Sequence, residues 1–204
     1  MDEKGERIPL TICDYDREAG TITIVFQPVG ASTTKMKELK AGDYFRDFTG
    51  PLGNASELVE EDIEELKKKK ILFDGSYGHA GMVTTMVEEL VEKGNKYDVC
   101  IAIGPMIMMK FVCLLTKKLG IPTVVSMNPI MVDGTGMCGA CRLHVGDEIK
   151  FACVDGPEFD GHLVNFDEAM KRQQMYKTQE GRAMLKLQEG DTHHGGCGQC
   201  GGDE

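Results

Sequence analysis

Residues 97–127 read YDVCIAIGPMIMMKFVCLLTKKLGIPTVVSM, and this stretch decides the fold class. Its first part, through Gly104, is a short apolar run typical of a buried strand, and IPTVVSM at its end is a second such run. Between them, Pro105 and Gly120 flank an apolar helical pattern at the positions where helices begin and end. A strand, a helix and a strand at this spacing predict two parallel strands joined by a right-handed crossover.

The segments before this stretch extend the pattern toward the N-terminus. MVTTMVEELVEKG predicts an amphipathic helix that ends at its glycine, and residues 57–70 predict another, whose acidic start and basic end suit the helix dipole. Residues 8–27 instead contain two β-rich runs joined by DREAG, and alternation places Ile22, Ile24 and Phe26 on one face. We therefore expect an antiparallel region of about four strands, followed by an α/β region.

The segments after it change character. Residues 131–156 read MVDGTGMCGACRLHVGDEIKFACVDG, a glycine-rich loop followed by a predicted hairpin with a tight Gly-Asp turn. Asn165 opens a predicted helix that runs to Gln188, with Glu168 completing a capping box. The tail, EGDTHHGGCGQCGGDE, is too rich in glycine to fold by burying apolar surface.

Composition narrows the class of protein. Hydrophobic residues make up 41% of the 204, enough for a real core. The net charge of −10 argues against nucleic acid as a partner, because phosphate binding needs a basic face. No apolar run approaches the roughly 20 residues of a membrane span, and the N-terminus, MDEKGERIPL, lacks the features of a secretory signal. We expect a cytoplasmic protein without a membrane span.

The eight cysteines point to metal chemistry rather than to disulfides. Five of them fall in two compact groups, each with a C-x-x-C, which in a cytosolic chain indicates metal or cluster binding. The other three lie in apolar contexts, so we expect them to be buried thiols without a metal role: Cys13, Cys100 and Cys113.

The group at 138–153 has the spacing of an iron–sulfur site. Plant-type [2Fe–2S] ferredoxins use C-x4-C-x2-C and a distant fourth cysteine, and Cys138, Cys141 and Cys153 match the last three of these ligands. Asp133 stands where the first cysteine would be, and its carboxylate is also an anionic ligand. The glycines between them suit a backbone that takes positive φ and brings its N–H groups close to sulfur.

The residues alone also allow two other interpretations, a zinc site at the same cysteines and a metal site in the tail. The same three thiols could hold zinc, with Asp133 or His144 as the fourth ligand, although zinc knuckles usually present two ligand pairs. In the tail, His193, His194, Cys197 and Cys200 could hold a separate metal ion or form a redox-accessible end.

A second type of site is indicated at IGP, residues 103–105. The motif ends a predicted parallel strand and opens a helix, where free N–H groups can bind phosphate. Gly104 permits close approach of a ligand. The methionines that follow, Met106, Met108 and Met109, are also typical of a helix core.

With its upstream aspartate, DGTGMCGACR resembles the electron-transfer subunits of dihydroorotate dehydrogenase and of NADH-dependent reduced ferredoxin:NADP oxidoreductase (sulfide dehydrogenase), in the ferredoxin–NADP reductase superfamily. The resemblance implies an α/β plus β fold with a truncated FAD-binding antiparallel β-barrel at 1–57 and a partial parallel NAD(P)-binding α/β domain at 58–130. It also implies a small [2Fe–2S] domain at 131–165, before a C-terminal helix and tail at 166–204. The implied cluster ligands are Asp133, Cys138, Cys141 and Cys153.

Other residues of the implied sites follow by position. RIPLT resembles the flavin-contacting strand and implies Arg7, Pro9, Leu10 and Thr11. VGAST resembles the pyrophosphate loop and implies Gly30, Ser32 and Thr33. DGSYG and IGPM resemble the nicotinamide-nucleotide elements and imply Gly75, Ser76, Gly104, Pro105 and Met106.

The resemblance implies an oxidoreductase subunit that passes electrons between NAD(P)H, FAD and a [2Fe–2S] cluster to a larger flavoprotein or iron–sulfur partner subunit. No residue is expected to act as an acid, a base or a nucleophile, because the redox chemistry belongs to the cofactors. The chain departs from the family in lacking several barrel strands and a G-G-x-G-x-A-P loop, which would lie between Phe73 and Asp74. An alternative function is therefore a cluster-only electron carrier or docking subunit that binds no nucleotide.

Overall fold

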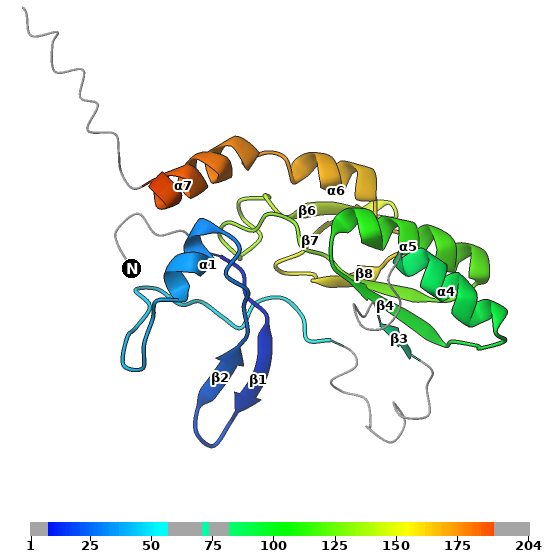
Figure 1. Ribbon diagram of the computed structural model, residues 1–204, viewed down its shortest axis with the longest axis horizontal. Helices are drawn as coiled ribbons and strands as arrows, with labels where there is room; N and C mark the ends of the chain where they lie inside the picture. Colours follow the sequence, from blue (N-terminus) through cyan, green and yellow to red (C-terminus); the bar gives the residue numbers. More distant parts are fainter. Residues whose placement is uncertain (1–7, 57–70, 74–81, 190–204) are drawn as a thin grey trace, which may run out of the picture. The chain divides into compact units, whose positions relative to one another are not determined.

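A computed structural model describes residues 8–56, 71–73 and 82–189 of the chain. The predicted helix at 57–70, most of the glycine-rich loop at 74–83 and the tail from 190 lie outside the described residues. The chain divides into two compact units, one built from residues up to Phe48 and from Met175 onward, the other from Thr49–Gln174. Elements of both are labelled in Figure 1.

The larger unit is built on a four-stranded sheet with the order β3-β4-β5-β8 (Figure 1). Strands β3 (Ile71–Phe73), β4 (Val99–Ile103) and β5 (Thr123–Ser126) are parallel, and β8 (Glu158–Asp160) pairs antiparallel with β5. Helix α5 (Met106–Leu119) connects β4 to β5. The predicted strand–helix–strand unit is therefore confirmed.

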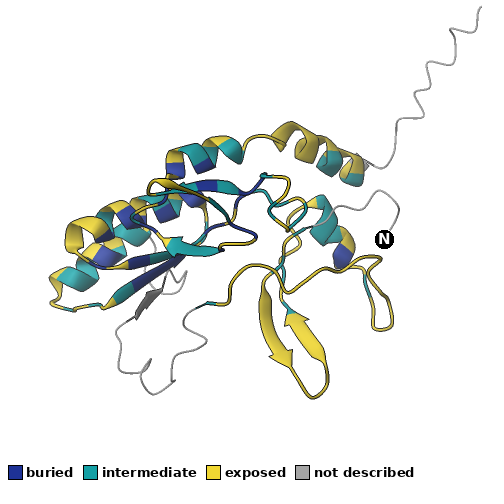
Figure 2. Cartoon of the chain, turned by 180° about the vertical axis from the view of Figure 1, so that it is seen from behind, coloured by how far each residue is buried: buried dark blue, intermediate teal, exposed yellow. Residues whose placement is uncertain are grey.

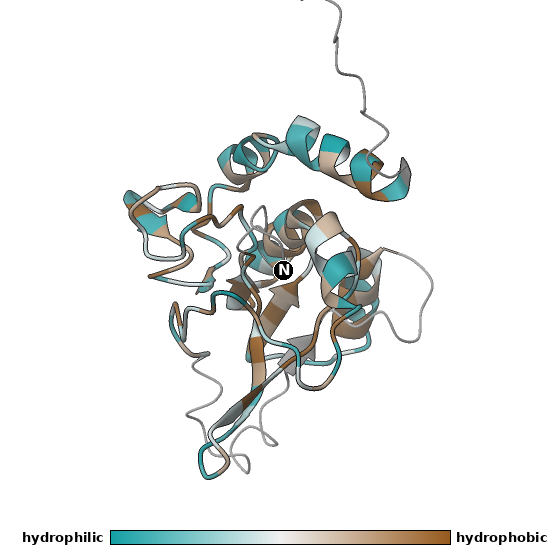
Figure 3. Ribbon diagram, turned by 90° about the vertical axis from the view of Figure 1, so that its left-hand side faces the viewer, coloured by the Kyte–Doolittle hydropathy of each residue, from teal (hydrophilic) through white to brown (hydrophobic). Residues whose placement is uncertain are grey.

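Two helices end where their glycines predict. α4 (Val83–Glu92) is followed by Gly94 at φ 84°, and α5 is closed by Gly120 at φ 69°, the left-handed geometry that glycine adopts at little cost. Apolar residues dominate the sheet strands, whereas helix α7 (Lys177–Glu189) is largely hydrophilic, a contrast visible in Figure 3.

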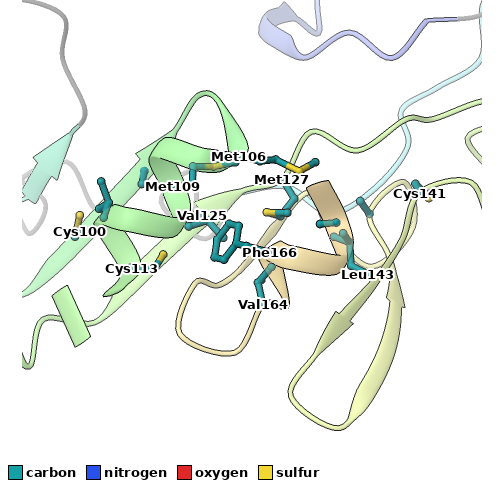
Figure 4. Packing of buried hydrophobic residues seen from close by; sticks show 14 of the residues in the cluster. Cys100, Met106, Met109, Cys113, Val125, Met127, Cys141, Leu143, Val164 and Phe166 are labelled. Carbon is teal, nitrogen blue, oxygen red and sulfur yellow. The ribbon is translucent and has the colours of Figure 1, made fainter. Parts of the chain in front are cut away.

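The core of this unit is continuous from the sheet to the cysteine-rich hairpin. Met109, Val112 and Val125 are almost completely buried between α5 and the sheet, and the same cluster extends to Cys141, Leu143 and Phe166 (Figure 4). Burial of Cys100 and Cys113 in it confirms two of the three predicted buried thiols. The hairpin is therefore packed into the core of the α/β unit.

The predicted hairpin is β6 (Arg142–Val145) and β7 (Glu148–Phe151), paired antiparallel. Gly146 at φ 60° opens its two-residue turn, and no non-glycine residue described has positive φ, which fits a type II′ turn. Helix α6 (Phe166–Arg172) follows, with the Asn165 side chain accepting a hydrogen bond from the Glu168 N–H at 3.1 Å.

One predicted helix is two in the structure, and its capping box is half formed. α6 ends at Arg172, and α7 begins at Lys177. Gln174 N–H bonds to the carbonyl of Lys171, three residues back, so the chain tightens and leaves the α-helix there. The Glu168 carboxylate contacts His144 Nδ1 rather than completing the predicted box.

The smaller unit contains the hairpin of β1 (Ile12–Asp16) and β2 (Thr21–Ile24), with helices α1 (Ala31–Met36) and α7 in contact. Among the described residues it has two strands rather than about four. Much of the hairpin surface is exposed, as the yellow arrows of Figure 2 show. Ile24 and Phe26 are half-buried, but Ile22 is exposed. Cys13 is also exposed, which corrects its predicted burial, because no further described strand covers β1.

None of the described helices is both long and apolar enough to cross a bilayer.

Candidate metal centre

The loop from Met131 to Cys141 connects β5 to β6 without regular structure. Gly134, Gly136 and Gly139 take φ values of 78°, 82° and 66°. A side chain at such φ would strain the backbone, so glycine is required at these turns. The predicted positive φ is confirmed at all three positions.

Asp133 organises the first half of this loop. Its Oδ1 accepts a hydrogen bond from the Thr135 N–H at 2.8 Å, and its Oδ2 accepts one from the Cys138 N–H at 2.9 Å. These hydrogen bonds lower the pKa of the Asp133 carboxyl, and the bond from the Thr135 N–H contributes most. The side chain is therefore an anion at neutral pH, and each oxygen keeps a lone pair for a metal ion.

Cys141 and Cys153 form a buried pair at the open end of the β6–β7 hairpin. Their side chains are almost fully buried, and their Sγ atoms lie 3.2 Å apart. Strand pairing brings them together, and the Ala152 N–H donates to the Cys141 carbonyl at 3.3 Å. Burial raises the pKa of the Cys153 thiol, and the hydrogen bond with Cys141 raises it further.

Cys138 is exposed, and its Sγ accepts a hydrogen bond from the Ala140 N–H at 3.5 Å. The Gly136 N–H acts in the same way on Cys153, where it opposes the rise in pKa. Backbone N–H groups therefore reach two of the predicted sulfur ligands. Donors of this kind stabilise a thiolate.

The four predicted ligands fall into two pairs. The Asp133 carboxylate accepts a hydrogen bond from the backbone N–H of Cys138, and the Sγ atoms of Cys141 and Cys153 are in contact. In the part of the chain that the structure describes, no three His, Cys, Asp or Glu side chains converge closely enough to hold one metal ion. His144, the alternative zinc ligand, is engaged by Glu168.

Sequence reasoning missed a contact between residues 50–54 and this loop. A Cβ built on Gly134 would lie 2.5 Å from Leu52 Cδ1, so the leucine covers that turn. Asn54 donates from its backbone N–H to the Gly156 carbonyl at 2.7 Å and from its side chain to the Asp155 carbonyl at 2.8 Å. The only sequence signal was a pair of glycines around Pro51.

Arg172 was also missed. From the end of α6 its Nη2 donates to the carbonyls of Gly139 at 3.0 Å and Ala140 at 3.2 Å, inside the C-x2-C turn. No local pattern marks this residue, because its partners lie more than 30 positions away in sequence.

The residues predicted to contact flavin lie in the smaller unit. Pro9 and Thr11 are exposed and Leu10 is half-buried, just before β1. Gly30 precedes α1, and Thr33 Oγ1 accepts hydrogen bonds from the N–H groups of Val29 and Gly30 at 3.1 Å. Ser32 is half-buried, and Arg7 lies outside the described residues. This unit has a surface hollow of about 390 Å³, which is lined by Leu39, Asp43, Tyr44 and Arg46. None of the residues predicted to contact flavin lines it.

The predicted nucleotide residues are described only in part. Gly104 and Pro105 lie between the carboxyl end of β4 and the start of α5, as predicted. The Met106 side chain is 3% exposed and Met109 is fully buried, so these methionines belong to the core. Gly75, Ser76 and the tail residues His193, His194, Cys197 and Cys200 lie outside the described residues.

Comparison with known proteins places an iron–sulfur domain match over this part of the chain. The sequence profile of the iron–sulfur cluster binding domain of dihydroorotate dehydrogenase B matches residues 128–165. The chain is 40% identical to a Thermotoga maritima homologue of the dihydroorotate dehydrogenase B (NAD(+)) electron transfer subunit, covering 88% of this chain and 80% of that protein. A chain from the solved structure of an NADH-dependent reduced ferredoxin-NADP oxidoreductase, described for flavin-based electron bifurcation, superposes with a TM-score of 0.78 at 38% identity. That match covers 92% of this chain and 84% of the other.

A further relative shows what this chain lacks. It is 53% identical to an uncharacterised protein of Clostridium beijerinckii, over all of this chain and 87% of that protein. The alignment spans 259 positions, although this chain has 204 residues. The relative therefore carries at least 55 residues within the aligned region that have no counterpart here.

Proposed function

The chain belongs to the family of dihydroorotate dehydrogenase B electron-transfer subunits and their homologues, and from this premise we propose that it passes electrons through a [2Fe–2S] cluster held by Asp133, Cys138, Cys141 and Cys153. It is an oxidoreductase subunit, and its electron acceptor in this proposal is a larger flavoprotein or iron–sulfur subunit. The electron donor is NAD(P)H, by way of FAD.

The observation that carries the proposal is the arrangement of the ligands in two pairs. Each iron of a two-iron cluster takes two protein ligands. Asp133 with Cys138, on the loop before β6, and Cys141 with Cys153, at the open end of the β6–β7 hairpin, supply two such pairs within the part of the chain that matches the iron–sulfur domain. A single zinc ion would need three or four ligands around one point, and the described residues offer no such group.

The loop also fits the chemistry of the group. Asp133 is anionic, and its two N–H donors leave room for ligation on each oxygen. The Ala140 N–H already points to Cys138 Sγ, a contact that stabilises thiolate ligands. When bound, the cluster supplies one-electron oxidation and reduction, while these residues hold and shield it.

Flavin and nucleotide sites are proposed at their predicted positions. The described residues are Pro9, Leu10, Thr11, Gly30, Ser32 and Thr33 for FAD and Gly104, Pro105 and Met106 for NAD(P). Burial of the Met106 side chain leaves its backbone N–H, at the start of α5, as the group that could meet a nucleotide. The 55 or more residues absent relative to the C. beijerinckii protein favour the second candidate, a cluster-only carrier.

Anaerobic purification followed by iron, sulfide, zinc and flavin analysis tests these assignments. About two irons and two sulfides with one flavin per chain are expected of a working reductase subunit. The same iron and sulfide content without flavin would identify the cluster-only carrier. Zinc without iron would overturn the proposal.

A further inference from the structure

We propose that Arg172 is a positioning residue that sets the reduction potential of the centre through the C-x2-C turn. The inference rests on the proposed function, because it takes Cys138 and Cys141 to be cluster ligands. Nothing in the spacing of the cysteines points to a residue 31 positions beyond Cys141.

Helix α6 gives Arg172 a fixed place. Phe166 and Ala169 anchor the helix in the core, with 6% and 2% of their surface exposed. Asn165 caps its start, and Asp167 pairs with Lys110 of α5 at 2.6 Å. The Arg172 side chain, in the last turn of α6, therefore contacts the metal loop from a helix that is fixed in the core.

The contacts of Arg172 connect it to a sulfur ligand through one peptide group. Its Nη2 donates to the carbonyl of Gly139, and the N–H of that same peptide unit, on Ala140, donates to Cys138 Sγ. Hydrogen bonds in a chain polarise one another, so a cation at the carbonyl strengthens the donor at the sulfur. A second bond to the Ala140 carbonyl fixes the next peptide, which leads into Cys141.

The guanidinium of Arg172 makes its hydrogen bonds to the C-x2-C turn, at the carbonyls of Gly139 and Ala140. Among the described residues no carboxylate pairs with its guanidinium, and its Nε is buried without a hydrogen-bond partner. A second hydrogen bond to the Gly139 carbonyl comes from the Arg142 N–H at 3.3 Å, so this oxygen is held from two sides.

The electrostatic consequence has a definite sign. Three thiolates and a carboxylate give the centre a net negative charge, which increases on reduction. A nearby cation and stronger N–H donors to sulfur both stabilise the more negative state. Arg172 therefore raises the reduction potential, and its removal lowers it.

The test is an EPR-monitored redox titration of the full chain, with iron and sulfide measured on every sample. Arg172→Gln removes the charge, whereas Arg172→Lys keeps the charge but places its nitrogen one atom short of Nη2. Lys171→Gln removes one positive charge from an exposed neighbour on the same helix and is the matched control.

We expect a midpoint potential shifted to more negative values in Arg172→Gln, a smaller shift in Arg172→Lys and a potential close to wild type in Lys171→Gln. Iron should also be lost to a chelator fastest from Arg172→Gln. If Arg172→Gln assembles no cluster, the test rests on Arg172→Lys. A wild-type midpoint potential and wild-type iron retention in Arg172→Lys would then overturn the inference. A shift in Arg172→Gln no larger than in Lys171→Gln would also overturn it. Absence of iron from the wild-type chain would instead count against the proposed function.

Discussion

In our account, Asp133 is the ligand of the centre that offers a carboxylate in place of a thiolate. It occupies the first ligand position of the plant-type spacing, and its carboxylate already accepts the N–H groups of Thr135 and Cys138. One side chain therefore folds the loop and, in our account, ligates iron.

Substitution of Asp133 separates these two roles. Asp133→Ala should lose most of its iron on purification, because both the ligand and the acceptor for two N–H groups are gone. Asp133→Cys should keep about two irons with an altered visible spectrum, since thiolate is the softer and commoner ligand. Full iron content with an unchanged spectrum in Asp133→Ala would contradict the ligand assignment.

Cys113 is a free thiol buried in the core of the α/β unit. Burial raises the pKa of Cys113 to about 12, and the neighbouring Cys100 adds to the rise. An unfolded thiol ionises near 9.0, so above that pH the unfolded chain binds fewer protons than the folded one. The free energy of unfolding must then fall as pH rises from about 9 toward 12.

The measurement is urea unfolding at a series of pH values from 8 to about 10.5. Cys113→Ala should be less stable than wild type at pH 8, because it loses packing against Gly161. Its stability should nevertheless fall less steeply above pH 9. Identical slopes for the two proteins would contradict the shifted pKa.

At this scale the sequence yields a ligand prediction but no prediction of the residues that contact those ligands. The spacing of Cys138, Cys141 and Cys153 is local information, and the structure brings Cys141 into contact with Cys153. Arg172 and Leu52 reach the loop that contains Cys138 from more than 30 and 80 positions away. Only tertiary packing creates those contacts, so no local pattern could have indicated them.

At the scale of elements, residues 50–54 act as a strap that contacts the metal loop at Gly134 and the turn after β7 at Asp155 and Gly156. Gly53 has φ of 72°, and a Cβ there would lie 2.6 Å from the carbonyl oxygen of Gly156. Gly120 has nearly the same φ, 69°, but open space where its Cβ would be. The two glycines have nearly the same φ, but only at Gly53 would a Cβ atom meet a neighbouring backbone atom.

This pair allows a matched test of the strap. Gly120→Ala should cost about 1 kcal/mol of unfolding free energy from left-handed strain alone. Gly53→Ala should cost at least about twice that, because a backbone oxygen cannot move aside as a side chain could. Denaturant unfolding of both variants gives the comparison, and equal costs would mean that residue 53 is not closely packed against the turn that follows β7.

Helix and strand predictions succeeded where periodicity and glycines agreed, as in α5 and in the β6–β7 hairpin. They failed at residues 173–176, where QQMY contains neither glycine nor proline but the helix still ends. The two helices belong to different compact units. A boundary set by tertiary packing leaves no local signal.

At the scale of the whole molecule, the C. beijerinckii protein carries at least 55 residues that have no counterpart in this chain. A glycine-rich loop at a helix N-terminus supplies much of the phosphate contact in dinucleotide sites. We predict that this loop belongs to the missing segment, at the junction of Phe73 and Asp74, and that the chain binds NADH and NADPH weakly.

A graft tests this prediction. Insertion of the relative's segment at that junction should tighten nicotinamide-nucleotide binding by about ten-fold or more in calorimetric titrations. A glycine–serine linker of equal length is the control for insertion alone. A graft that folds, by circular dichroism, yet binds no better than the linker control would place the nucleotide determinants elsewhere.

The central claim is that Asp133, Cys138, Cys141 and Cys153 hold a two-iron cluster, and one measurement tests it most directly. The chain, purified anaerobically, is reduced with dithionite and examined by EPR beside a Cys153→Ala variant, with iron and sulfide counted in both. The account predicts about two irons and two sulfides in the wild-type chain, together with the half-integer-spin EPR signal of a reduced two-iron cluster. It predicts that the Cys153→Ala variant loses the iron and sulfide and also the EPR signal. A wild-type chain that carries zinc and gives no such signal would contradict it.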